Sequence, residues 1–107
     1  MVRGEVVRVA APRRARGHEQ QGARPAVIVQ SDDLLALSTV LVAPTSRSAA
    51  PATFRPVIEL AGTTTRVLVD QTRALDAQAI AGSLGRLSLE ELEMVDEALG
   101  VVLGLRF

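Results

Sequence analysis

The sequence contains no cysteine and no lysine, a single histidine, and two aromatic residues, both phenylalanine. Without cysteine the chain has no disulfide framework and no thiolate metal site, and one histidine does not make a zinc site. No apolar run approaches the ~20 residues of a membrane span, and the N-terminus lacks the apolar core of a signal peptide. We therefore expect a soluble cytoplasmic protein that uses no metal and no cofactor.

The length and the apolar content describe a small domain with an aliphatic core. The chain has 107 residues, of which 48% are hydrophobic and 2% aromatic. We expect one domain spanning residues 1–107. A domain of this size buries only about two-thirds of the surface that its unfolded chain exposes, so assembly into an oligomer would add stability.

The charges are arranged as a gradient along the chain. Residues 1–31 hold six arginines and two glutamates, a net charge of +4, whereas residues 88–107 hold five acids and one arginine, a net charge of −4. Genome composition is the simpler explanation for the exclusive use of arginine. Arginine nevertheless binds phosphate through two hydrogen bonds and stacks on bases, so the basic end is where an anionic polymer would bind.

Short apolar runs separated by turn residues predict a mainly β fold with five to seven strands. Pro25 cannot donate to a sheet, so we place it at the first position of a strand, and Pro44 should end another. One helical turn is expected near residues 34–37 and another near residues 76–81. The expected strands cover residues 2–9, 26–30, 39–43, 57–60, 64–69 and 83–87.

Residues 88–103 predict an amphipathic helix at the C-terminal end. Ser88 and Glu91 have the spacing of a capping box, and Gly104 is a natural helix stop. Apolar residues recur at steps of three and four and should form one stripe against the barrel: Leu92, Val95, Leu99 and Val102.

Polar and ionisable residues gather in a long segment and at three strand ends. Residues 10–23 are rich in arginine and have no apolar periodicity, which is often the mark of a functional loop, although its arginines are as well explained by exposure to solvent. Residues 45–48 resemble an anion-binding corner, but an ordinary polar turn is the favoured interpretation. Gln71 and Arg73 would share a face if their strand continued. The three strand ends place one candidate site at Arg24, Thr45 and Gln71.

Four segments, taken together, resemble the MazF/PemK family of toxins. Residues 17–29 (GHEQQGARPAVIV) resemble the family signature G-x-E-Q-x-G-x-R-P-x-V-V-V. Residues 3–6 resemble its opening, residues 43–46 the end of its third strand, and residues 69–76 its [ED]-Q-x-R-x-[LI]-D segment. The closing helix is similar as well. The sequence departs from the family at Val7, where many members carry tryptophan.

The resemblance implies a small SH3-like barrel with added helices, the fold of the MazF, CcdB and PemK toxins. It implies a homodimeric, metal-independent endoribonuclease (an mRNA interferase) that cleaves single-stranded RNA at short sequences. It also implies a cognate antitoxin as partner, with DNA contacted only through the antitoxin complex. The family's catalytic residues fall on Arg24 and Thr45, and its signature glutamate on Glu19. The residues expected to bind substrate are His18, Gln20, Ser46, Arg47, Gln71 and Arg73.

The chemistry of these residue types suits RNA cleavage without a metal. The 2′-OH attacks the adjacent phosphate, and the negative charge that develops can be bound by the guanidinium of Arg24. Arginine is a poor base because its pKa exceeds about 12, so Glu19 or His18 is the better candidate for proton transfer. Thr45 could donate to a phosphoryl oxygen or pass a proton to the leaving group. For Glu19 the alternative is an ion pair that orients Arg24, and for His18 a solvated loop side chain.

Two other functions use the same type of fold. The first is a barrel that binds nucleic acid or protein without cutting it. The second is a toxin that acts on a topoisomerase. The occurrence of Glu19, Arg24, Thr45 and Gln71 in one sequence favours the ribonuclease, because a binding module has no need of that set.

Overall fold

The computed structural model of the chain describes residues 1–10 and 24–105. Strands, short 3-10 helices and one α-helix follow one another along these residues. Their bounds are β1 Glu5–Val9, β2 Arg24–Ile28, η1 Asp32–Leu34, β3 Thr39–Ser46, β4 Val57–Leu60, β5 Thr63–Val67, η2 Val69–Gln71, β6 Arg73–Asp76, η3 Ala77–Ala79, β7 Ile80–Arg86 and α1 Leu89–Leu103.

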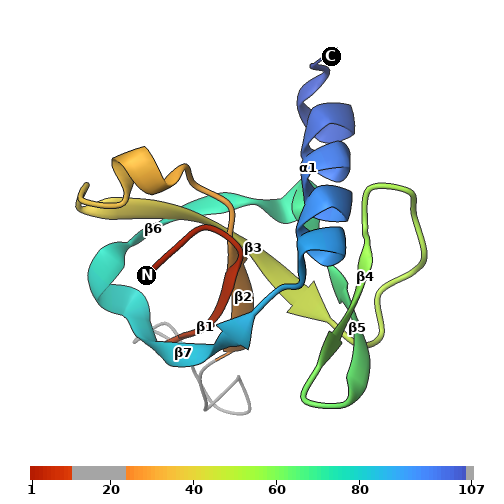
Figure 1. Cartoon of the computed structure of the whole chain (residues 1–107), viewed down its shortest axis with the longest axis horizontal. Helices are drawn as coiled ribbons and strands as arrows, with labels where there is room; N and C mark the ends of the chain where they lie inside the picture. The colour runs from red at the N-terminus through yellow and green to blue at the C-terminus, as the bar shows by residue number, and fades with distance from the viewer. Residues whose placement is uncertain (11–23, 106–107) are drawn as a thin grey trace, which may run out of the picture.

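The strands form one antiparallel sheet in the order β4-β5-β3-β2-β1-β7. Strand β3 pairs with β6 and β5 in succession along its length. Its first half pairs with β6, and its last two residues pair with β5. Figure 1 shows the sheet curling into a half-barrel, with the β4–β5 hairpin on the other side of α1. The prediction of a mainly β, small-barrel fold with a C-terminal helix is confirmed.

Both faces of the central strands are buried, in two separate apolar clusters. Val6 and Val27 point into a cluster that packs under α1, whereas Val7 and Ile28 point into a second cluster inside the curl of the sheet. Adjacent residues of a strand point to opposite faces, so a strand buried on both faces is apolar throughout and does not alternate. This explains the continuous apolar run after Pro25. Val7, where the sequence departs from the family that it resembles, is a buried member of the second cluster.

The α-helix begins and ends as the sequence predicts. The Ser88 hydroxyl accepts from the Glu91 amide, the Glu91 carboxylate accepts from the Ser88 amide, and Gly104 ends the helix with φ of 70°. Val95 is fully buried against the sheet and Leu92 and Leu99 are half-buried, but Val102 remains 38% exposed. The predicted stripe is therefore wrong at its last residue, because the C-terminal turns of α1 extend past the sheet (Figure 1).

Three details of the strand prediction are wrong. Pro44 does not end a strand but lies inside β3, at the point where β3 exchanges β6 for β5, so its missing N–H breaks no regular ladder. Pro25 is the second residue of β2. The strand expected to run to residue 69 ends at Val67 and gives way to a 3-10 turn, after which the unpredicted strand β6 begins.

Candidate active site

One cavity of about 650 Å³ lies where β2 begins and β3 ends, facing the tip of the β4–β5 hairpin. We call it the Arg24 cavity. Its lining comes from four parts of the chain, namely the start of β2, the end of β3, the β4–β5 hairpin and β7, which contribute Arg24, Pro25, Thr45, Ser46, Arg47, Ser48, Leu60, Ala61, Thr63, Thr65 and Leu84. We call the residues Arg24, Pro25, Thr45 and Ser46 the β2–β3 wall, and Leu60, Ala61, Thr63 and Thr65 the hairpin wall.

Arg24 is exposed at the first position of β2, and its backbone is held by the strand that follows it. Val27 and Ile28 of that strand are fully buried, and Arg24 itself pairs with Val9 of β1. Among the described residues, no carboxylate lies within ion-pair distance of Arg24. A rigid backbone thus presents a guanidinium at the edge of the cavity.

Thr45 is tied to the start of β2 by its side chain. Its hydroxyl donates to the Pro25 carbonyl oxygen over 3.0 Å. A carbonyl oxygen only accepts, so the hydroxyl hydrogen points at Pro25 while the lone pairs can still accept a hydrogen bond. To donate to a substrate oxygen, Thr45 would have to turn this hydrogen away from Pro25. In this structure the Thr45 hydroxyl therefore holds the start of β2, the strand that carries Arg24, through its hydrogen bond to Pro25.

Ser46, Arg47 and Ser48 form the polar corner at the end of β3. The Ser46 hydroxyl oxygen accepts from the Ser48 amide over 3.2 Å, which is the hydrogen bond of an ordinary polar turn. All three residues nevertheless line the cavity. The corner is therefore both the turn that the sequence favoured and a part of the candidate site.

The charge of the described lining is of one sign. Arg24 and Arg47 contribute guanidinium groups, and no aspartate or glutamate lies among the described lining residues. Two cations with nearby hydroxyl groups favour an anionic ligand such as a phosphate, which arginine can bind through two hydrogen bonds. In the parts of the chain that are described, no cluster of histidine, aspartate and glutamate is suited to hold a metal ion.

The hairpin wall is the part of the site that the sequence did not predict. Ala61 and Gly62 form its turn with φ of 53° and 79°, and positive φ at both central residues is the mark of a type I′ turn. Thr65 is buried, and its hydroxyl donates to the Thr63 carbonyl oxygen over 3.1 Å. The wall is apolar with hydroxyl groups and carries no charge. Its sequence offers no motif beyond a turn, so no signal assigns it to a site.

Gln71 and Arg73 do not line the cavity. Gln71 lies in the turn η2 and Arg73 begins β6, so the shared strand face expected from their spacing does not exist. Arg73 pairs with Val42 of β3, three residues before Thr45, a separation of about 10 Å along a strand. Arg73 therefore lies outside the cavity and is connected to it through the backbone of β3.

The remaining candidates, His18, Glu19 and Gln20, lie outside the described residues. Arg24 is the first described residue after this segment. Of the nine predicted site residues, the structure brings four together in one cavity: Arg24, Thr45, Ser46 and Arg47. Within the described ranges, no helix has the length and apolarity needed to span a membrane.

Solved structures share this fold. An endoribonuclease from a mycobacterial species, in complex with its cognate antitoxin, superimposes with a TM-score of 0.81 at 20% identity, covering 100% of this chain and 98% of that one. The Mycobacterium tuberculosis toxin MazF-mt6 gives a TM-score of 0.80 at 17% identity over 96% of this chain and 99% of that one. MazF from Deinococcus radiodurans gives 0.77 at 26% identity over 98% and 97% of the two chains.

Sequence comparisons agree with the fold. Rv3098A of Mycobacterium tuberculosis (strain ATCC 25618 / H37Rv) carries the name of a proposed toxin. It is 42% identical to this chain over 106 residues, which cover 98% of this chain and 99% of that protein. Residues 2–103 match the family described as PemK-like, MazF-like toxin of type II toxin-antitoxin system. The chain therefore belongs to the PemK-like, MazF-like family of toxins of type II toxin–antitoxin systems.

Proposed function

We propose that this chain is a metal-independent, sequence-specific endoribonuclease, the toxic component of its toxin–antitoxin module. The observation that carries the proposal is the meeting of Arg24 and Thr45 in one cavity whose described lining holds two arginines and no carboxylate. The name endoribonuclease, given to structural neighbours of this fold, supports the same activity.

In the proposed reaction, the 2′-OH of the RNA attacks the adjacent phosphorus and the 5′-oxygen of the next nucleotide leaves. Negative charge then grows on the phosphoryl oxygens, and the Arg24 guanidinium binds it through two N–H groups. Glu19 or His18 takes the proton from the 2′-OH, and a proton reaches the leaving oxygen by way of Thr45. Thr45 would need to release Pro25 to take this part, and otherwise it serves by holding β2 in place.

The substrate extends beyond the bond that is cut. Ser46 and Arg47 lie in the Arg24 cavity and would hold the scissile phosphate or its neighbour. Gln71 lies in η2 and Arg73 begins β6, both outside the lining of the cavity, so we assign them to a neighbouring nucleotide of the same RNA strand. Gln20 would contact RNA from the segment before Arg24. An RNA several nucleotides long fits this distribution better than a mononucleotide does.

In this proposal the protein is a cytoplasmic homodimer. A cognate antitoxin neutralises it, and it contacts DNA only through the antitoxin complex. Related solved structures include an endoribonuclease in complex with its cognate antitoxin and a MazE–MazF complex. A two-fold dimer places two Arg24 cavities on one particle. Light scattering at micromolar concentration should give twice the monomer mass of 11.3 kDa. A mass of one monomer would contradict the dimer.

Mapping of RNA ends tests the activity. The purified chain is incubated with a long RNA in EDTA, and the products are analysed by mass spectrometry. We expect 2′,3′-cyclic phosphate and 5′-hydroxyl ends, with no effect of the chelator. Ends that carry 5′-phosphate, or activity that EDTA removes and magnesium restores, would contradict the mechanism. Binding of RNA without cleavage would favour the non-catalytic barrel instead.

A further inference from the structure

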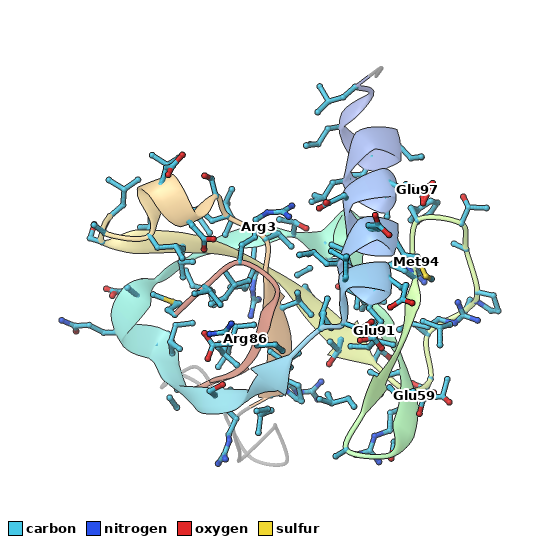
Figure 2. The ribbon with its side chains drawn as sticks, viewed as in Figure 1. Arg3, Glu59, Arg86, Glu91, Met94 and Glu97 are labelled. Carbon is cyan, nitrogen blue, oxygen red and sulfur yellow. The ribbon has the colours of Figure 1, made fainter. Side chains whose placement is uncertain are left out.

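The carboxylate of Glu91 makes two hydrogen bonds to two different parts of the molecule. One oxygen, Oε1, accepts from the Ser88 amide over 2.9 Å and completes the capping box of α1. The other oxygen, Oε2, accepts from the Glu59 amide of β4 over 2.9 Å. Figure 2 shows Glu91 at the first turn of α1, beside the strand that carries Glu59. A capping residue requires only the first of these bonds.

The second bond is made to an edge strand that has one strand neighbour, although its residue Ile58 is buried in the core. Within the described residues, β4 pairs with β5 alone, and β5 joins the rest of the sheet through the pairs Thr45–Val67 and Ser46–Arg66. The Glu59 amide is on the edge of β4 that β5 leaves open, since β4 ends the strand order. Glu91 therefore ties the open edge of the hairpin to α1.

The hydrogen bond between Glu91 and the Glu59 amide lies directly beside the Arg24 cavity. Leu60 and Ala61 of the hairpin wall follow Glu59 in the chain. The side chain of Glu59 also accepts from the Thr64 hydroxyl over 3.0 Å, across the hairpin. A shift of the Glu59 backbone would therefore carry both strands of the hairpin, and the wall of the cavity with them.

We propose that Glu91 is a positioning residue for RNA binding, which sets the hairpin wall against Arg24 by holding the Glu59 amide. This inference rests on the proposed function, because RNA is the ligand assigned to the cavity. Glutamate suits the task because each carboxylate oxygen accepts for one partner. Glutamine has a single acceptor oxygen and would give up either the cap or the strand.

Two substitutions separate this role from helix capping. Ser88→Ala removes the hydroxyl that accepts from the Glu91 amide and leaves the bond to Glu59 in place. Glu91→Ala removes both carboxylate contacts, including the one to Glu59. If the wall contributes binding to substrate and transition state alike, Glu91→Ala should raise KM about 5-fold, as loss of one hydrogen bond does, with kcat unchanged. Ser88→Ala should leave both constants within about 2-fold, as a change of helix cap alone.

Amide hydrogen exchange supplies a second readout that needs no RNA. The Glu59 amide should exchange about 5-fold faster in Glu91→Ala, and at the wild-type rate in Ser88→Ala. Equal exchange rates in the two variants, or equal KM values in two variants of an active enzyme, would overturn the proposed tie. If the wild-type protein cleaves no RNA, the proposed endoribonuclease fails, and the exchange rates still decide whether Glu91 holds the hairpin.

Discussion

The two walls of the Arg24 cavity are held in different ways. The β2–β3 wall stands on strands whose Val27, Ile28 and Val42 are fully buried. The hairpin wall stands on β4 and β5, which are anchored in the core by Ile58 and Val67 but pair with the rest of the sheet at two residues only, with the open edge of β4 held by the Glu91 carboxylate. Groups that do chemistry need a rigid support, whereas a wall that fits a substrate tolerates adjustment. We therefore assign catalysis to the first wall and recognition to the second.

The largest effect is expected at Arg24. Arg24→Ala should lower the rate of RNA cleavage by a factor of about 100–1,000, because it removes a donor to the developing charge. The free energy of unfolding should change by about 0.5 kcal/mol or less, since the side chain is exposed. Arg24→Lys should restore little activity, as an ammonium cannot bind two oxygens side by side. Cleavage rate and melting temperature should be measured on the same samples.

Arg8 provides a matched control for this prediction. It is an exposed arginine of β1 that does not line the cavity, so Arg8→Ala removes an equal charge elsewhere. Cleavage by Arg24→Ala at close to the wild-type rate would show that Arg24 is not catalytic. Inactivity caused by unfolding would instead make Arg24 a structural residue.

A smaller effect on the same wall is expected at Thr45. Thr45→Val removes the hydroxyl and leaves the partly buried Pro25 carbonyl oxygen without this donor. We expect a loss of about 1–3 kcal/mol in the free energy of unfolding and a fall in cleavage of about 10-fold. Thr45→Ser keeps the hydroxyl and should restore most of both. Urea unfolding and cleavage rates distinguish the three proteins, and a stable but inactive Thr45→Val would show that the hydroxyl acts on the substrate alone.

A substitution in the hairpin wall should stabilise the protein more readily than one in the β2–β3 wall. Ala61 has φ of 53°, a left-handed conformation that asparagine tolerates better than alanine. Ala61→Asn should raise the free energy of unfolding by about 0.5–1 kcal/mol, because it relieves this strain in the type I′ turn. Urea unfolding measures the change, with Ala50→Asn in the connection before β4 as the control. An unchanged or lowered stability would show that Ala61 is not strained.

The smallest effect concerns the base of the hairpin. Arg55 donates through Nε and Nη2 to the two oxygens of Asp70, at 3.1 and 3.0 Å. These hydrogen bonds lower the pKa of Asp70 below its usual range, so the folded state favours the ionised carboxylate. The resulting stabilisation is present at neutral pH and is lost as the pH falls through the folded pKa.

Asp70→Asn should therefore reduce stability slightly at neutral pH, and the deficit should begin to shrink below a pH of about 4, near the unfolded pKa of aspartate, and vanish below the lowered folded pKa. Urea unfolding of both proteins across the acid range measures it. A deficit that stays constant with pH would mean that the Arg55–Asp70 pair makes no electrostatic contribution to stability.

The most accurate sequence predictions concern features whose interacting residues lie close together in the chain. The capping box of Ser88 and Glu91 and the stop at Gly104 each depend on residues within a few positions. The family assignment was also readable, because its motif of residues 17–29 is contiguous, and the comparisons confirm it. Strand β6 was missed because its four residues of mixed polarity become a strand only beside β3.

The amino-acid pattern alone is enough to predict the class of the fold, the C-terminal helix, the toxin family and the candidates Arg24 and Thr45. What surrounds these two residues follows from the folding of the whole sheet. Pro25 and Thr45 lie 20 positions apart and meet through a hydrogen bond, and Leu60, Thr63 and Leu84 face them across one cavity. Such neighbours depend on the curl and pairing of the whole sheet, which no local pattern encodes. The same holds for Glu91, whose capping role is local and whose bond to Glu59 is not.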